Sequence, residues 1–327
     1  MQFPSNKILR TPVTSLVFRE FYLFLQFSWR DWSATIIPAS LFAPGAMKGL
    51  AYDTAAYKYL IMVLWVTSYI YAFNLYTQVN SLDEDRTNKP DRPLPSGAVT
   101  EAGTWIRCAV LWSLFFAIGI KVPAIIPETI SHAVMAYFLT ATKLGNTWLG
   151  KNTVAMTVMT WSLLSAARKL ISPVTPRSSD HVIGVALWAG LVSQTQDFRD
   201  QKGDLITRRQ TLPLAFGDSL AGYMVAFFFM PLAYIIIYWH NIGIYAPWML
   251  GALHASVSYR ILVFREIKAD HQTYMLVTYM FCLTVAISSV VELGFVLDDV
   301  PMEVTLLRLL GNLVRGDAIV LRHSSYR

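Results

Sequence analysis

Long apolar runs set the strongest limit on how this chain can fold. Nine of them lie near residues 31–50, 55–81, 102–121, 124–143, 152–171, 181–196, 217–239, 244–264 and 272–296. An apolar helix of about 20 residues crosses the hydrocarbon core of a bilayer, and only helices or closed barrels satisfy their own backbone polar groups there. Only 15% of the residues are charged, whereas soluble domains usually carry about 25%. The sequence therefore predicts an all-α integral membrane protein, a single domain over residues 1–327 with about nine transmembrane helices.

The segments at the two ends of the chain have a different character. Residues 1–30 include SLVFREFYLFLQFSWR, which is typical of an amphipathic helix lying in the membrane interface. Residues 300–327 carry arginines at positions 308, 315 and 322 and form a predicted amphipathic tail. The first residues, MQFPSNKILRTPVT, have prolines and polar side chains where a signal peptide needs an apolar core, so we expect no cleavable signal.

Lysine and arginine are distributed unevenly between the two sides of the predicted bundle. With nine spans, seventeen of them fall on the amino-terminal side and six on the other, with the carboxy-terminal segment left aside. The positive-inside rule then places the amino-terminal side in the cytosol. We therefore expect a multi-pass protein of an internal membrane, of the endoplasmic reticulum type. Some of these charges can also serve a binding site, because two of the clusters flank acidic residues.

Two polar stretches repeat the same spacing at the ends of the second and sixth apolar runs. Steps of four, three and four residues separate Asn74, Gln78, Ser81 and Asp85, and likewise Ser193, Asp197, Asp200 and Asp204. On a helix this spacing places all four side chains on one face. The repeat indicates an internal duplication whose halves face one central cavity.

The acidic residues of these stretches predict a bound cation. Three aspartates on one helical face repel one another unless a cation lies among them, and hard oxygen ligands with room for water suit Mg²⁺ held together with substrate phosphates. The neighbouring phosphate partners are Arg92, Arg199, Lys202, Arg208 and Arg209. The alternative is a surface network of acids and bases at loop ends that binds nothing.

The two polar stretches also resemble the motifs of a known protein family. The stretches NSLDEDRTNKPDRPLPSG and DFRDQKGDLITRRQTLP resemble the two aspartate-rich motifs of the UbiA superfamily of intramembrane prenyltransferases, and the resemblance covers nearly the whole chain. It implies an all-α bundle around a lipid-accessible central cavity. It also implies that Mg²⁺ bridges the aspartates to a prenyl diphosphate whose allylic C–O bond is ionised. The implied partners are this diphosphate and the lipid bilayer, with no nucleic acid and no protein partner.

The two motifs match the family to different degrees. The second is a complete DxxDxxxD, through Asp197, Asp200 and Asp204. In the first, Thr77, Gln78, Ser81 and Asp85 occupy the places of the family's NDxxDxxxD, so that only the last aspartate is retained. This variant is similar to the fungal membrane-bound terpene cyclases of the superfamily, which cyclise a prenyl diphosphate without an acceptor.

The resemblance implies the roles of individual residues. Lys143 and Asn152, in ATKLGNTWLGKN, fit positions on the diphosphate side. The predicted metal ligands are Glu84, Asp85, Asp197, Asp200 and Asp204, and the four aspartates are also catalytic. The predicted substrate-binding residues are Asn74, Gln78, Asn80, Ser81, Arg92, Lys143, Asn152, Lys202 and Arg209.

An allylic cation needs a dry cavity lined by aromatic faces. The candidates are Trp65, Tyr69, Tyr71, Phe73, Tyr76, Tyr137, Trp161 and Trp188, although aromatic residues are also common in helix packing and at bilayer interfaces. Tyr71 is the catalytic candidate among them, because it lies one turn before Asn74.

The predicted function is Mg²⁺-dependent ionisation and cyclisation of a C15 or C20 prenyl diphosphate, with a lean to C20, to give a terpene and diphosphate. The alternative enzyme is a prenyltransferase that acts on an aromatic or quinone-type acceptor. A transporter or scaffold is the non-enzymatic alternative.

Overall fold

The computed structural model describes residues 13–294, and the predicted tail at 300–327 lies outside these residues. The described part is helical. The longer helices are α1 (Val13–Ser28), α2 (Ile36–Met47), α3 (Tyr52–Asn80), α5 (Glu101–Lys121), α6 (Ile126–Ala141), α7 (Met156–Ile171), α8 (Pro176–Val192), α13 (Pro247–Val263) and α14 (Ile267–Leu293). The shorter ones are α4 (Leu82–Asn88), α9 (Asp197–Ile206), α10 (Leu212–Phe216), α11 (Asp218–Met224) and α12 (Met230–Trp239).

The prediction of an all-α membrane protein is confirmed. Each predicted apolar run contains one of these helices, and α11 continues through a π-helical turn, Val225–Phe229, directly into α12. Five of the described helices are long and apolar enough to cross a membrane. The described helices are compatible with nine spans, since α2 is apolar but shorter, and α7, α8 and α13 have 16 or 17 residues each.

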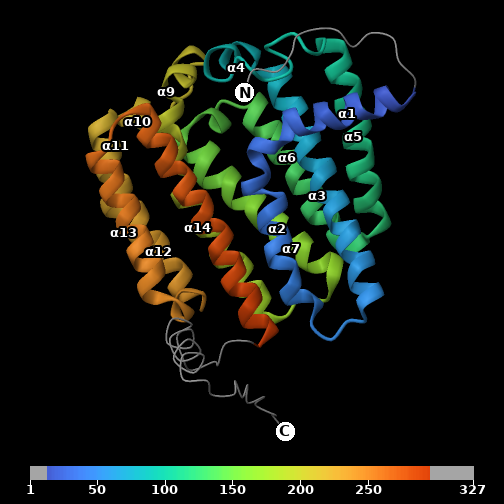
Figure 1. The fold of residues 1–327 in the computed structure, drawn as a ribbon. Helices are drawn as coiled ribbons and strands as arrows, with labels where there is room; N and C mark the ends of the chain where they lie inside the picture. Colours follow the sequence, from blue (N-terminus) through green and yellow to red (C-terminus); the bar gives the residue numbers. More distant parts are fainter. Residues whose placement is uncertain (1–12, 295–327) are drawn as a thin grey trace, which may run out of the picture.

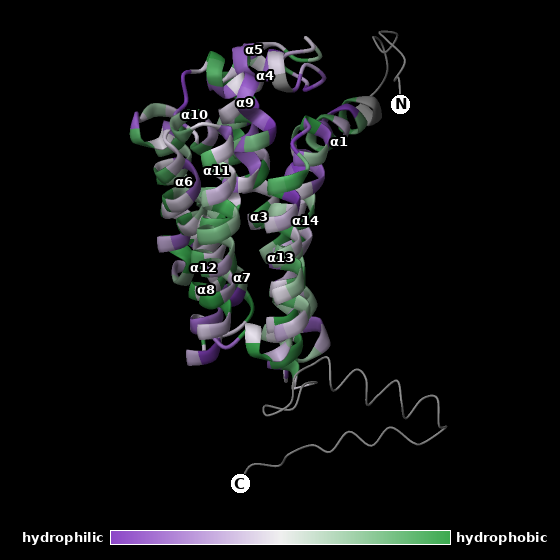
Figure 2. Ribbon diagram, turned by 90° about the vertical axis from the view of Figure 1, so that its left-hand side faces the viewer, coloured by the Kyte–Doolittle hydropathy of each residue, from purple (hydrophilic) through white to green (hydrophobic). Residues whose placement is uncertain are grey.

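The long helices run side by side as a bundle (Figure 1). Helix α3 packs against α5, α2 against α14, and α7 against α8. Helices α4, α9 and α10 gather at one end of the bundle, and α1 lies across the bundle near the same end. In Figure 2, green hydrophobic residues cover much of the helix bodies, and purple hydrophilic segments concentrate toward the ends. A small residue allows one close helix contact: the backbone nitrogen of Gly45 in α2 donates to Ser289 Oγ in α14 at 2.7 Å.

Helix α3 extends beyond what a bilayer needs. Its 29 residues span about 44 Å at about 1.5 Å per residue, whereas the hydrocarbon core is about 30 Å thick. The helix is therefore longer than the hydrocarbon core is thick. Its last turns carry the first polar motif, and α4 follows after a single residue, Ser81. Charged side chains are less costly to place at such a helix end than at the centre of a bilayer.

Candidate active site

The two motifs lie on neighbouring short helices at the same end of the bundle. Glu84 and Asp85 are in α4, Asp197, Asp200 and Asp204 are in α9, and α4 packs against α9. All five acids are buried. The juxtaposition that the duplicated spacing predicts is therefore present, although the helix that carries Asp85 is α4 and not a continuation of α3.

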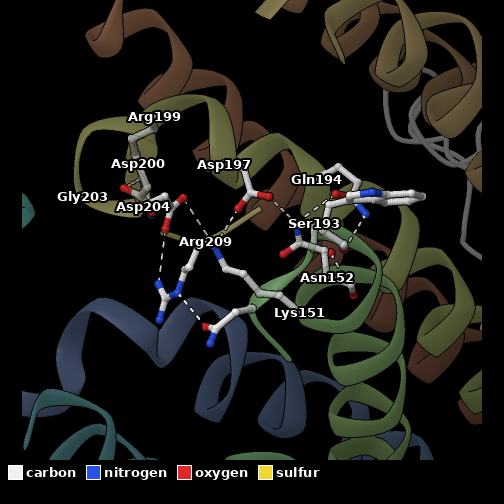
Figure 3. A network of polar contacts seen from close by, with 12 residues as sticks. Lys151, Asn152, Ser193, Gln194, Asp197, Arg199, Asp200, Gly203, Asp204 and Arg209 are labelled. Carbon is white, nitrogen blue, oxygen red and sulfur yellow. Dashed lines mark hydrogen bonds and ion pairs between the residues drawn. The ribbon is translucent and has the colours of Figure 1, made fainter. Parts of the chain in front are cut away.

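A loop between α6 and α7 supplies the partners of Asp197. Lys151 Nζ lies 2.7 Å from Asp197 Oδ1, and Asn152 Nδ2 donates to Asp197 Oδ2 at 2.6 Å (Figure 3). The same Asn152 nitrogen donates to Gln194 Oε1 at 2.9 Å. Lys151 and Asn152 belong to a π-helical segment, Leu149–Ala155, at the start of α7. These contacts hold the first acid of the second motif between a cation and an amide.

Backbone contacts fix that loop against the segment after α9. Trp148 N donates to Gln210 O, and Gln210 N donates to Asn146 O, each at 2.8 Å. The turn before this contact contains Arg208, which has a left-handed backbone with φ of 54°. This turn brings the next residue, Arg209, back toward α9, where its backbone nitrogen donates to Asp204 O at 2.9 Å.

Arg209 joins the two motifs. Its Nη1 lies 2.8 Å from Glu84 Oε2 in α4 and 3.3 Å from Asp204 Oδ1 in α9. Lys151 Nζ approaches Asp204 Oδ2 at 3.8 Å (Figure 3). One guanidinium therefore holds an acid from each motif. Burial raises the pKa of Glu84 above its ordinary value.

The remaining two acids have their own cations. Arg199 Nε and Nη2 lie 3.0 and 3.1 Å from the carboxylate oxygens of Asp200. Arg92 Nη1 lies 2.8 Å from both oxygens of Asp85. Burial raises the pKa of Asp200, but the charges of Lys89 and Arg199 outweigh burial and lower this pKa to about 2. Burial lowers the pKa of Lys89, and the positive charge of Arg92 lowers it further. Lys89 also lies near Asp85.

The donor set can be tested against a bound Mg²⁺. Carboxylate oxygens are the ligands that Mg²⁺ prefers, and the buried Asp204 Oδ2 accepts no hydrogen bond. In the described part of the chain, however, no group of three acidic, histidine or cysteine side chains is already arranged to hold a metal. Instead, each motif acid faces an arginine or lysine. The residues fit Mg²⁺ in kind, and binding it requires the acids to exchange partners.

The polar side chains of the first motif differ in their hydrogen-bond partners. Gln78 is fully buried, and neither its Oε1 nor its Nε2 has a hydrogen-bond partner. Asn80 and Ser81 instead donate to backbone oxygens of their own helix, those of Tyr76 and Thr77. Of these three side chains, only that of Gln78 makes no hydrogen bond to a described residue. Asn74 Nδ2 is also committed, because it donates to Asp31 Oδ2 at 2.9 Å.

Tyr71 lies against α1. Its ring contacts those of Phe24 and Phe27, with centroids 5.4 and 5.8 Å apart, in a small apolar cluster separate from the main core. The acids of the two motifs take no part in this cluster. The sequence assigned Tyr71 to the site face, but that face of α3 is partly covered by α1. Of the other aromatic candidates, Trp65, Tyr69 and Trp188 are buried in the main core, Phe73 and Trp161 pack against it, Tyr76 accepts from Thr140 Oγ1, and Tyr137 is exposed.

The predicted cations are only partly brought to the site. Arg92, Arg199 and Arg209 contact the acids. The side chains of three others are exposed, and no described ion pair includes them, namely Lys143, Lys202 and Arg208. Two cations that the sequence analysis missed take part instead, namely Lys151 and Lys89. Both lie inside the quoted stretches, Lys151 in ATKLGNTWLGKN and Lys89 in NSLDEDRTNKPDRPLPSG. Their position within these stretches was the available signal.

Two hollows in the described part of the protein lie away from these acids. One, of about 380 Å³, is lined by Pro176, Arg177, Asp180, Asn241, Ile244 and Tyr245. The other, of about 170 Å³, is lined by Tyr76, Trp112, Phe116, Ala133, Ala136 and Tyr137 between α3, α5 and α6. Neither is lined by an acid of the motifs, so the central cavity stays a prediction.

Known proteins share both sequence and fold with this chain. Residues 34–285 match the UbiA prenyltransferase family. A diterpene cyclase of Hericium erinaceus is 47% identical over 276 residues, which cover 84% of this chain and 90% of that protein. A polyprenyl transferase of the same organism is 43% identical over 287 residues, covering 87% of this chain and 100% of that protein. Among solved structures, a UbiA homologue from Archaeoglobus fulgidus bound to GPP and Mg²⁺ has a TM-score of 0.58 at 11% identity, covering 83% of this chain and 99% of that one.

Proposed function

The chain belongs to the UbiA prenyltransferase family, and from this premise we propose that it ionises and cyclises a prenyl diphosphate without an acceptor. The substrate is a C15 or C20 diphosphate, with C20 favoured, and the products are a terpene hydrocarbon and diphosphate. The observation that carries the proposal is the asymmetry of the site. A complete second motif faces a first motif in which a neutral, unpartnered amide, Gln78, stands where the family places an aspartate. The similarity to a diterpene cyclase supports the same reading.

The acids and the cations have complementary tasks in this proposal. Glu84, Asp85, Asp197, Asp200 and Asp204 would hold Mg²⁺, which when bound stabilises the negative charge that develops on the leaving diphosphate. In the structure these acids are neutralised by five cations, Lys89, Arg92, Lys151, Arg199 and Arg209. A diphosphate can compete with these acids for arginine, because guanidinium binds phosphate oxygens in pairs, as it binds carboxylates. Substrate entry would therefore draw the cations onto phosphate.

The ion pairs also explain how the site keeps its shape before substrate arrives. A buried acid without a cation is unstable, so Arg209 and Lys151 keep Glu84, Asp197 and Asp204 close together.

Loss of the diphosphate from carbon leaves an allylic cation, which water would quench. Tyr69, Trp65 and Phe73 lie on α3 on the membrane side of the motif, in or against the buried core, where water is excluded.

A second enzymatic function is supported by one specific observation. The polyprenyl transferase of Hericium erinaceus matches this chain along the whole of its own length. A prenyltransferase would bind the diphosphate in the same way but transfer the allylic cation to an aromatic or quinone-type acceptor. The two functions differ in whether a product forms when no acceptor is present.

The experiment that separates them uses membranes containing this protein. They are incubated with C10, C15 and C20 prenyl diphosphates and Mg²⁺ without acceptor, and extracts are analysed by gas chromatography. The proposal expects a hydrocarbon from at least one substrate, and none from membranes with EDTA. A product that forms only after an aromatic acceptor is added would contradict cyclisation and support transfer.

We also propose that the acidic end of the bundle faces the cytosol in an internal membrane of the endoplasmic reticulum type. The support is the excess of lysine and arginine on the amino-terminal side. Water-soluble prenyl diphosphates would then reach the site from the cytosol, with their tails entering from the interface.

A further inference from the structure

One carboxylate outside both motifs lies close to the site. Asp31 is half-buried in a short 3-10 helix, Trp29–Ala34, which connects α1 to α2 and packs against α14. Its Oδ2 accepts a hydrogen bond from Asn74 Nδ2 at 2.9 Å. Asn74 belongs to the polar face of α3, one turn before Gln78. A residue more than forty positions earlier in the chain is thus brought against the first motif.

Asp31 differs in its partner from the acids of the two motifs. The motif acids Asp85, Asp197, Asp200 and Asp204 each lie within ion-pair distance of an arginine or lysine. The same holds for Glu128 with Lys169 and for Glu292 with Arg168, in the interior away from the motifs. Among the described ion pairs none includes Asp31, whose side-chain partner is a neutral amide. A carboxylate that forms no ion pair with a described residue accepts a proton more readily than one held by a cation.

The surroundings of Asp31 are aromatic. Its charge acts on the hydroxyl groups of Tyr69 in α3 and Tyr274 in α14, and on Arg199 in α9. The buried Tyr69 hydroxyl has no hydrogen-bond partner among residues 13–294, and the Tyr274 ring lies 4.2 Å under the Arg199 guanidinium. Tyr69 precedes Gln78 by nine residues, about 13 Å along the helix axis. Asp31 is therefore linked through Asn74 to the face of α3 that carries Gln78, and its charge reaches Tyr69, deeper in the bundle.

We propose that Asp31 is the proton acceptor that ends the cyclisation, an inference that rests on the function proposed above. A cyclised carbocation becomes a neutral olefin when a carbon next to the cationic centre loses its proton. The electron pair of that C–H bond forms the C=C bond, and the proton passes to a carboxylate oxygen of Asp31. After the product leaves, the proton returns to water or diphosphate, and Asn74 keeps the carboxylate oriented throughout. The negative charge also stabilises cationic carbon near Asp31, as fixed charges do in water-poor sites.

The test separates ionisation from proton loss. Asp31→Asn keeps the shape of the side chain and can still accept the hydrogen bond from Asn74, but it is a very weak base. We expect the rate of diphosphate release to stay within about threefold of wild type. The share of the main wild-type hydrocarbon should fall at least about tenfold, in line with the loss of a general base, with earlier olefins or alcohols taking its place. Asp31→Glu, which retains a carboxylate, should restore deprotonation but with a changed ratio of olefins.

The matched control is Asp53→Asn, which removes an exposed acid in the first turn of α3, at the helix end opposite the motif. It should leave both diphosphate release and the product ratio at wild-type values. If Asp31→Asn does not accumulate in membranes, Asp31→Glu alone decides, because moving the base by one methylene must alter the olefin ratio.

Three outcomes overturn the inference and can be told apart. An unchanged product ratio in Asp31→Asn and Asp31→Glu means that another group takes the proton. A parallel loss of diphosphate release and hydrocarbon in Asp31→Asn, not restored by Glu, means that Asp31 serves ionisation or folding. A wild-type protein that makes no hydrocarbon without acceptor overturns the proposed function itself, and this inference with it.

Discussion

At the scale of single residues, the site is an array of buried ion pairs and not an open cluster of acids. Arg209, which contacts both Glu84 and Asp204, is the clearest case, since one cation holds residues 120 positions apart. Removing one partner of a buried pair typically destabilises a protein by about 3–5 kcal/mol, because the other charge is left uncompensated. Variants in this site therefore need a measure of folded protein beside the measure of activity.

The first prediction concerns Asp200. Asp200→Ala should lower turnover at least about a hundredfold, the usual upper range for loss of a metal-site residue, because Arg199 would then lack its acid and Mg²⁺ a ligand. The measurement is hydrocarbon formed per amount of membrane-inserted protein. The control is Asp83→Ala, in α4, whose side chain is 80% exposed and pairs only with Arg86 among the described residues. Wild-type turnover of Asp200→Ala would contradict the assignment.

The second prediction distinguishes two substitutes in the first motif. Gln78→Ala should change the rate or the product pattern severalfold, since the buried Gln78 amide has no partner of its own and is available to substrate. Ser81→Ala should stay near wild type, because the Ser81 hydroxyl is engaged by Thr77 O at 2.7 Å. Both variants are assayed for KM and product ratio. Equal effects of the two would mean that the hydrogen bonds of the unliganded state do not predict which residue meets substrate.

Several site residues could be predicted from the sequence, and the others show where its limits lie. The 4-3-4 spacing identified both acidic faces, because helical periodicity is local. Lys151 was missed in favour of Lys143, since the choice depends on how the loop after α6 folds back on α9. Asp31 was missed because its contact with Asn74 is made across a long separation in the chain. The orientation of Tyr71 toward α1 likewise follows from tertiary packing.

At the scale of elements, the loop between α6 and α7 decides whether the cations reach α9. Its course depends on close backbone contacts at two glycines. A Cβ at Gly145 would lie 2.1 Å from Phe138 O, and one at Gly150 would lie 1.9 Å from Leu144 O. Gly150 immediately precedes Lys151 and Asn152, the partners of Asp197. The loop can take this path only without side chains at these positions.

The third prediction follows from that contact. Gly150→Ala should lower turnover about tenfold or more, because the backbone must shift and overpacking of this kind costs about 1–3 kcal/mol. The shift would move Lys151 and Asn152 away from Asp197. The control is Gly251→Ala in α13, where the nearest atom to the new Cβ, in Tyr234, is 3.6 Å away. If both alanine variants retain full turnover, the loop is more adaptable than its contacts indicate.

At the scale of the whole molecule, the sequence could predict the class of fold because a bilayer permits few solutions. Apolar runs located the helices to within a few residues, as in the predicted 102–121 and the observed Glu101–Lys121. Their arrangement was less accessible. Nothing in the periodicity of α2 indicates that Gly45 will lie against Ser289 of α14, because that contact joins distant parts of the chain. The sequence also predicted one continuous helical face through Ser81, whereas the structure has a break there between α3 and α4.

The last prediction concerns the orientation of the molecule in the membrane. The acidic end, with α4 and α9, should face the cytosol, because its side of the chain carries most of the lysines and arginines. In a variant with Cys108→Ala and Cys282→Ala, single cysteines are introduced by Asp83→Cys in α4 and Asp53→Cys at the opposite end of α3, both exposed positions. In sealed microsomes with the cytosolic face outward, a membrane-impermeant maleimide should label the Asp83→Cys protein. The Asp53→Cys protein should be labelled only after the membrane is permeabilised with detergent. The reverse pattern would place the diphosphate site on the luminal side. The excess of lysine and arginine on that side would then reflect the ion pairs of the site and not the orientation in the membrane.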